Sequence, residues 1–122
     1  TLYHASAVVA SNYLVTLEHF ALKLLKQADL SEQEAYRILE PLIMGTLKNI
    51  KSKGSRAALT GPVARGDDEI VSRHLKDIDE KLPQFAGLYR MLGQHTLEIA
   101  GDLPENARQA LTDLFKKRQP RK

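Results

Sequence analysis

The stretch from Leu2 to Ala28 constrains the fold more than any other part of the sequence. It contains neither Pro nor Gly, and the 13 residues from Ala5 to Leu17 carry no charge. Apolar residues fall on every side of a helical wheel, and such a helix is either buried on all sides or inserted in a membrane. The uncharged run is too short to span a bilayer, which needs about 20 residues. We therefore predict a long central helix, about 40 Å long, that other helices or a second subunit cover.

The next part of the sequence indicates a second long helix. Ser31 and Glu34 form a capping box, which marks a helix start. Apolar residues then recur with a period near 3.6 over residues 35–50. Pro41 lies inside this stripe and lacks an amide hydrogen, so it is expected to kink or split the helix. Gly54 is the predicted stop.

Residues 54–66 fit no regular period and predict the one long connection of the chain, with enough apolar residues to favour order. Asp67 or Asp68 then caps another helix. Three amphipathic stripes follow, separated by Pro83 and Gly101. No stretch alternates apolar and polar residues for long enough to predict a strand. The expected fold is therefore a single all-α domain of five or six helices around the first one.

Composition excludes several classes of protein. The chain has 122 residues and no Cys, which suits one domain and rules out disulfides and thiolate metal sites. Much of the net charge of +3 comes from the tail Lys116–Lys122, and the other charges are interspersed, so we expect no nucleic-acid partner and no membrane partner. No signal peptide is visible, and a cytoplasmic location is expected. The chain begins at Thr1 inside helix-like sequence, so we expect a piece of a longer or processed protein.

The titratable residues do not predict a metal site or a nucleophile. None of the four histidines shows the His-x-x-x-His or Glu-x-x-His spacing of a helical metal site with a third ligand, and His74 and His95 are expected at helix surfaces or as cap partners. A Gly-x-Ser-x-Gly turn, a phosphate loop and a dinucleotide fingerprint are all absent from the sequence. We expect this chain alone to bind no cofactor.

One polar strip interrupts the apolar first helix. At 100° per residue, His4 and Ser11 lie about 20° apart on the helical wheel, and Asn12 lies about 80° from His4. Two interpretations stay open. In the first, the three residues form a polar seam whose hydrogen bonds are satisfied inside the fold, with Asn12 bonding another helix. Alternatively, they face a ligand, and His4 donates, accepts or shuttles a proton.

A second polar feature is the segment Thr60-Gly61-Pro62-Val63-Ala64-Arg65-Gly66-Asp67. Arg65 stands just before a helix start, where free amide hydrogens and the helix dipole favour anions. Its guanidinium can bind a carboxylate or a phosphate through two parallel hydrogen bonds. In the alternative interpretation, Arg65 pairs locally with Asp67 or Asp68.

Together these features resemble a known family over roughly Tyr3 to Ala100. The family is the uncharacterised helical C-terminal domain that follows a Rossmann-like domain in a group of NAD(P)-dependent oxidoreductase-like proteins. Its wider kin are the C-terminal domains of 6-phosphogluconate dehydrogenase, β-hydroxyacid dehydrogenases and pyrroline-5-carboxylate reductase. The resemblance rests on four segments, Tyr3-His4-Ala5-x-Ala7-Val8-x-Ala10-Ser11-Asn12-Tyr13, Leu42-x-x-Gly45-Thr46-Leu47-x-Asn49, Leu59-Thr60-Gly61-Pro62-x-x-Arg65-Gly66-Asp67 and Leu88-Tyr89.

The resemblance implies that the first helix forms a homodimer core and one wall of a substrate cleft. Asn12 resembles the Asn that lies near the substrate or nicotinamide in these proteins. Val8 stands where the β-hydroxyacid enzymes carry a catalytic Lys, so His4 becomes the candidate general acid or base.

The resemblance also implies a small anionic substrate, which Ser11, Thr60, Gly61, Arg65 and Asp67 would help to bind. NAD(P) would be bound mainly by a nucleotide-binding domain that this chain lacks, so the chain alone is expected neither to bind a dinucleotide fully nor to catalyse. The alternative, from another functional class, is a non-catalytic helical module for dimerisation or protein interaction.

Overall fold

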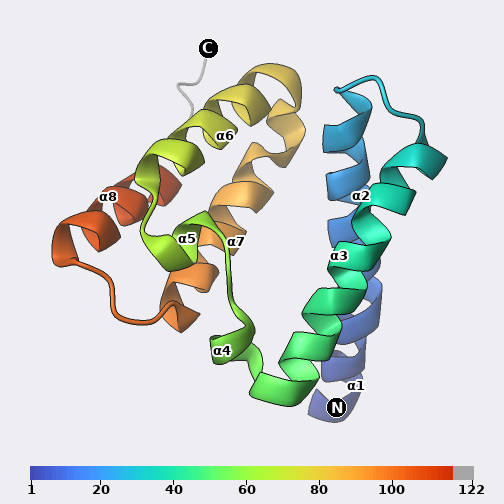
Figure 1. The fold of residues 1–122 in the computed structure, drawn as a ribbon, viewed down its shortest axis with the longest axis horizontal. Coiled ribbons are helices and arrows are strands. Elements are labelled where there is room, and N and C mark those ends of the chain that lie inside the picture. The colour runs from blue at the N-terminus through green and yellow to red at the C-terminus, as the bar shows by residue number, and fades with distance from the viewer. Residues whose placement is uncertain (117–122) are drawn as a thin grey trace. The chain divides into compact units, whose positions relative to one another are not determined.

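A computed structural model describes residues 1–116, and every regular element among them is a helix (Figure 1). This confirms the predicted all-α class. The chain divides into two compact units, Thr1–Met44 and Gly45–Lys122. The single domain expected from the length stays a prediction, and the basic tail beyond residue 116 lies outside the described residues.

The first helix runs without a break through three segments: α1 (Leu2–Ala7), the π-helical turn η1 (Val8–Asn12) and α2 (Tyr13–Lys26). The absence of Pro and Gly explains this continuity, because neither a missing amide hydrogen nor excess backbone freedom interrupts the ladder. The π turn was not predicted. It spaces its hydrogen bonds five residues apart instead of four and inserts an extra residue into the helical register.

The first helix buries few of its residues. Within α1, η1 and α2 only Phe20 is buried, with 6% of its surface exposed. Tyr3 and Val15 are 89% and 67% exposed. Within Thr1–Met44, α3 therefore leaves most of the first helix exposed, and coverage by other helices or by a second subunit stays a prediction.

The helix α3 (Glu32–Lys53) begins at the predicted capping box. The backbone N–H of Glu34 donates to Ser31 Oγ over 3.2 Å, and the N–H of Ser31 donates to Glu34 Oε1 over 3.4 Å. Pro41 does not split the helix, which continues to Lys53. Loss of one hydrogen bond, at a cost of about 3 kcal/mol, is offset by the bonds on either side. Gly54 ends the helix with a φ of 83°.

The connection after α3 is more regular than predicted, because it holds two single-turn helices, α4 (Ser55–Ala58) and α5 (Pro62–Arg65). Gly61, with a φ of 93°, leads into Pro62 at the first position of α5. Gly66, with a φ of 71°, ends it in the left-handed region. A Cβ atom at Gly66 would stand 3.1 Å from Ala107 Cβ, so both the backbone and the packing require glycine there.

The second unit is built on α6 (Asp68–Lys81), α7 (Ala86–Ile99) and α8 (Glu105–Lys116), with the short 3₁₀ turn η2 (Pro83–Phe85) between the first two. Helices α6, α7 and α8 contact one another in pairs, and α5 contacts both α6 and α7 (Figure 1). Their apolar faces meet in one cluster of buried residues: Val71, Leu75, Leu97, Leu111 and Phe115.

Gly93 and Phe115 make the closest approach in this core. A Cβ atom added to Gly93 would overlap the ring of Phe115, which is itself buried. The absence of a side chain at residue 93 therefore lets the ring lie directly against the backbone of α7.

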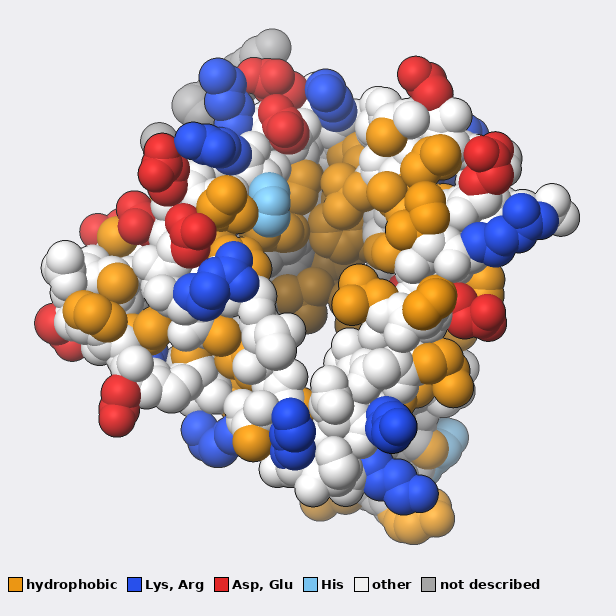
Figure 2. Space-filling model, in the orientation of Figure 1, with side chains coloured by type: hydrophobic (Ala, Val, Ile, Leu, Met, Phe, Trp, Pro, Cys, Tyr) orange, Lys and Arg blue, Asp and Glu red, His pale blue; other side chains and the backbone are white. Residues whose placement is uncertain are grey.

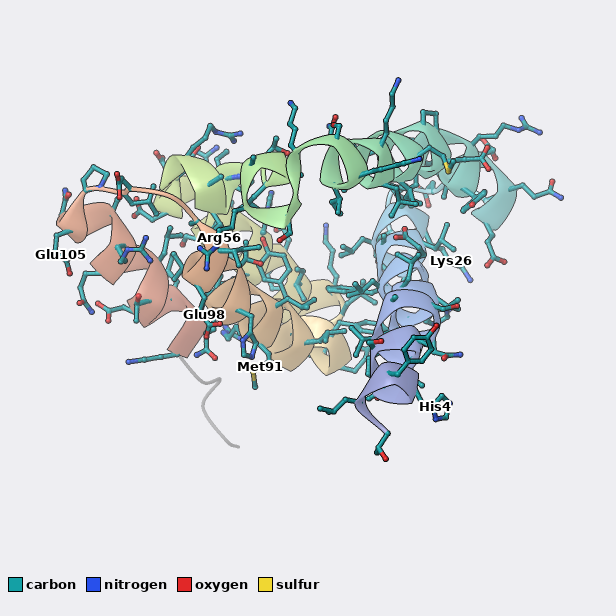
Figure 3. The ribbon with its side chains drawn as sticks, turned by 90° about the horizontal axis from the view of Figure 1, so that it is seen from below. His4, Lys26, Arg56, Met91, Glu98 and Glu105 are labelled. Carbon is teal, nitrogen blue, oxygen red and sulfur yellow. The ribbon has the colours of Figure 1, made fainter. Side chains whose placement is uncertain are left out.

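Two arginines bind the carbonyl groups at the end of α7. Arg108 donates to the carbonyl oxygens of Leu97 and Gly101, each over 3.1 Å. Arg56 donates to the carbonyl oxygen of Glu98 over 3.4 Å, and Figure 3 shows its side chain beside this end of the helix. These bonds satisfy carbonyls that have no partner within the helix, and they place positive charge at the negative end of its dipole.

We predict that Gly93→Ala lowers the free energy of unfolding by about 1–3 kcal/mol, because the new methyl group overpacks the core against Phe115. Gly87→Ala on the same helix is the matched control, since nothing lies within 4 Å of the added Cβ atom. The control is expected to stabilise the protein by about 0.5–1 kcal/mol. Urea unfolding followed by circular dichroism measures both. Equal effects of the two variants would contradict the packing argument.

Candidate functional site

The polar strip of the first helix is exposed rather than buried. His4, Ser11 and Asn12 all face solvent, and Figure 3 shows the His4 side chain projecting from α1. Within residues 1–116, the side chains of Ser11 and Asn12 make no hydrogen bond. The satisfied polar seam, with Asn12 bonding another helix, is therefore not formed within Thr1–Met44.

The π turn changes the geometry of this strip. Ser11 and Asn12 both belong to η1, whereas His4 lies before it in α1. The angles of about 20° and 80° assume a regular α-helix and do not hold across the extra residue of a π turn. Single π turns inside α-helices occur frequently at functional sites. Two unpaired polar side chains within such a turn are consistent with a site that faces a ligand.

The second polar segment is fixed by local structure. Asp67 caps α6, because its Oδ1 accepts a hydrogen bond of 3.2 Å from the backbone N–H of Ile70. This confirms the predicted cap and gives Asp67 a structural role. Arg65 is exposed and, among the residues the structure describes, pairs with neither Asp67 nor Asp68. The local ion pair is therefore not observed, and the role of Arg65 as an anion anchor stays a prediction.

The two halves of the predicted site belong to different units. His4, Ser11 and Asn12 lie in Thr1–Met44, and the segment from Thr60 through Asp67 lies in Gly45–Lys122. Their convergence on one cleft stays a prediction.

The structure brings together a pair of residues to which the sequence pattern does not point. The ring Nδ1 of His74 on α6 lies 2.8 Å from the hydroxyl oxygen of Tyr89 on α7. The two rings meet edge to face, with centroids 6.1 Å apart and planes at 89°. Burial raises the pKa of Tyr89 above its ordinary value. The only signal in the sequence was that Tyr89 belongs to one of the segments behind the resemblance.

The first unit also contains a cavity of about 240 Å³. It lies where α2 ends and α3 begins, and its lining combines basic, acidic and apolar side chains: His19, Leu22, Lys23, Lys26, Leu30, Ser31 and Glu32. Ligand pockets for drug-sized molecules span about 300–1,000 Å³, so this cavity suits a smaller ligand than a dinucleotide. Nearby, partial burial raises the pKa of Glu18.

Residues 1–116 offer neither a metal site nor a membrane-spanning helix. They contain no group of three or more His, Asp or Glu side chains that could hold a metal ion. In this part of the chain, no helix combines the length and the apolar character that crossing a membrane requires.

One family model matches most of the chain and identifies the family to which it belongs. The family model described as Domain of unknown function (DUF2520) matches residues 1–96. The chain belongs to this family. The match covers the first helix, the segment from Thr60 to Asp67 and both members of the His74–Tyr89 pair. It confirms the uncharacterised helical domain in the resemblance, whereas the Rossmann-linked parent and the wider superfamily stay predictions. Comparisons of this DUF2520 domain with curated proteins and with solved structures found no match.

We predict that Asp67→Ala destabilises the DUF2520 domain by about 0.5–2 kcal/mol, because the N–H of Ile70 loses its capping oxygen. Asp67→Ser keeps a capping oxygen and is expected to retain most of the stability. Thermal unfolding of the two variants measures the difference. If both lose the same stability, the cap is not the main contribution of Asp67.

Proposed function

We propose that this DUF2520 domain is the substrate-binding and dimerisation domain of an NAD(P)-dependent oxidoreductase-like protein. The observation that carries the proposal is the first helix, which is apolar all round and yet exposed, and whose surface is interrupted by polar residues at a π turn. A nucleotide-binding domain of the parent protein would hold NAD(P), and the present domain would supply a wall of the substrate site.

Exposed apolar residues support assembly. Large contiguous apolar patches are rare on monomeric proteins and mark interaction surfaces. Figure 2 shows hydrophobic side chains gathered over α3 and at the start of α1. The most exposed large apolar residues of the first helix (α1, η1 and α2) and of α3 are Leu2, Tyr3, Val9, Tyr13, Val15, Ile38, Leu42 and Met44. Burial of apolar surface contributes about 25 cal/mol per Å², so a second copy that covered these residues would be held by a favourable free energy.

Polar residues on the same surface support substrate binding. The Asn12 side chain offers both a donor and an acceptor, and Ser11 lies next to it in the π turn. In the proposal, these two residues bind the substrate and His4 transfers a proton. Arg65, whose guanidinium pairs with no acid among residues 1–116, binds the anionic group of the substrate, with Thr60 and Gly61 beside it.

A second candidate function is a non-catalytic helical module for dimerisation. The same exposed apolar helix favours it, because assembly alone would account for those residues. The two functions differ in the role of the polar residues: an assembly module has no need of Asn12 or Arg65, whereas a substrate-binding domain loses activity without them.

We predict that Val15→Lys converts a dimer of the chain into a monomer, because a charge in an apolar interface pays a large desolvation penalty. Met91→Lys is the control, since Met91 lies on α7 in the other unit and is comparably exposed, at 53% (Figure 3). The mass in solution, measured by analytical ultracentrifugation, is expected to stay dimeric for this control. A monomeric wild-type chain would contradict dimerisation through the first helix.

A further prediction concerns the parent protein. Dinucleotide fluorescence titrations are expected to show binding of NADH or NADPH to the parent and none to the 122-residue chain. In the parent, Asn12→Ala should lower kcat/KM by roughly 5–150-fold, which corresponds to the loss of about 1–3 kcal/mol of hydrogen bonding. Asn106→Ala, on the exposed start of α8, serves as the control and should leave kcat/KM unchanged. A parent that binds no dinucleotide would favour the assembly module.

A further inference from the structure

The His74–Tyr89 pair has no role in the proposed function. We propose that His74, oriented by the hydroxyl group of Tyr89, is a binding site for a small molecule that carries a carbonyl or carboxylate oxygen, such as a 2-oxo acid. The site lies wholly within the second unit, on α6 and α7, and needs neither a nucleotide-binding domain nor the first helix.

The direction of the hydrogen bond follows from the surroundings of Tyr89. Its ring packs against the buried core cluster, and burial raises the pKa of its hydroxyl group, which therefore keeps its proton at neutral pH. A half-buried hydroxyl group needs an acceptor, and in residues 1–116 its partner is Nδ1 of His74. In the proposal, Tyr89 donates to Nδ1, and a neutral ring of His74 then carries its proton on Nε2.

The hydrogen bond to Tyr89 fixes the orientation of the His74 ring and leaves its other nitrogen available to a ligand. His74 is exposed although Tyr89 is half-buried, so one ring nitrogen is held by the protein while the opposite edge of the ring is free. The Nε2–H group is then a donor of fixed orientation for a ligand oxygen. Histidines that bind or transfer protons in enzymes are held in this way, with one nitrogen fixed by a partner so that the other meets the substrate.

A purely structural role explains the pair less well, because α6 and α7 are already joined by a stronger contact. Arg90, next to Tyr89, donates two hydrogen bonds of 3.2 and 2.9 Å to the carboxylate of Asp79 on α6, and both side chains are largely buried. An ion pair with two parallel hydrogen bonds is stronger than one hydrogen bond between neutral groups. The helices therefore do not depend on His74 for their contact.

The neighbouring surface suits a small, partly apolar ligand. Leu92 follows Tyr89 by three residues on α7, which places the two side chains on the same face, and it is partly exposed. An apolar side chain beside a polar donor is the usual composition of a small-molecule site. Pyruvate has both an oxygen acceptor and a methyl group and is the simplest probe of this chemistry.

The test uses nitrogen-15 spectra of the histidine rings in the full 122-residue chain at neutral pH. The expected result is a His74 ring with its proton on Nε2, and a saturable shift of its signals on addition of pyruvate, with a midpoint of about 1–10 mM. Tyr89→Phe removes the hydroxyl group and keeps the ring. It is expected to reduce the tautomer preference and to weaken the pyruvate response at least several-fold.

Two controls separate binding from general effects. Tyr36→Phe, on the exposed surface of α3, removes another tyrosine hydroxyl and should leave the His74 signals unchanged. His95, which faces Glu98 on the exposed side of α7, should show no saturable shift. The proposal is overturned if the neutral His74 ring carries its proton on Nδ1, if His95 responds as His74 does, or if Tyr89→Phe binds pyruvate unchanged. The mass measurement of the proposed dimer is independent of all three outcomes.

Discussion

The packing of α8 against α7 in the second unit requires a glycine at residue 93, opposite the buried ring of Phe115. Because residue 93 has no side chain, α8 can place a large aromatic ring against the backbone of α7. The same helix α8 places Ala107 against Gly66, at the turn that joins α5 to α6. One helix, α8, therefore contacts both the backbone of α7 and the turn that follows Arg65.

The first unit, in contrast, buries few of its apolar residues. Its helices bury only Phe20 and Ala35, although the first helix is among the most apolar parts of the chain. Hydrophobic free energy scales with the area removed from water, so most of the stabilisation available to these helices is not realised within this unit. A surface of this kind is more consistent with association than with an isolated unit.

Helix-capping and helix-stop patterns in the sequence correctly predicted the features that involve residues close together in the chain. The capping box of Ser31 and Glu34, the cap at Asp67 and the stop at Gly54 each involve groups within four residues, and all three were confirmed. Pro41 does not split α3, because one missing hydrogen bond does not outweigh those around it, and the alternative of a kink stays a prediction. The His74–Tyr89 bond joins residues on different helices, so only the packing of α6 against α7 reveals it. Convergence of the two polar segments involves two units and stays a prediction for the same reason.

The π turn has a consequence for the whole first helix. One extra residue in a helix rotates everything on one side of it by about 100° relative to the other side. Side chains of α1 and α2 that a regular α-helix would align therefore point in different directions across residues 8–12. The helix can present two surfaces to two different neighbours, with Ser11 and Asn12 at the point where one surface gives way to the other.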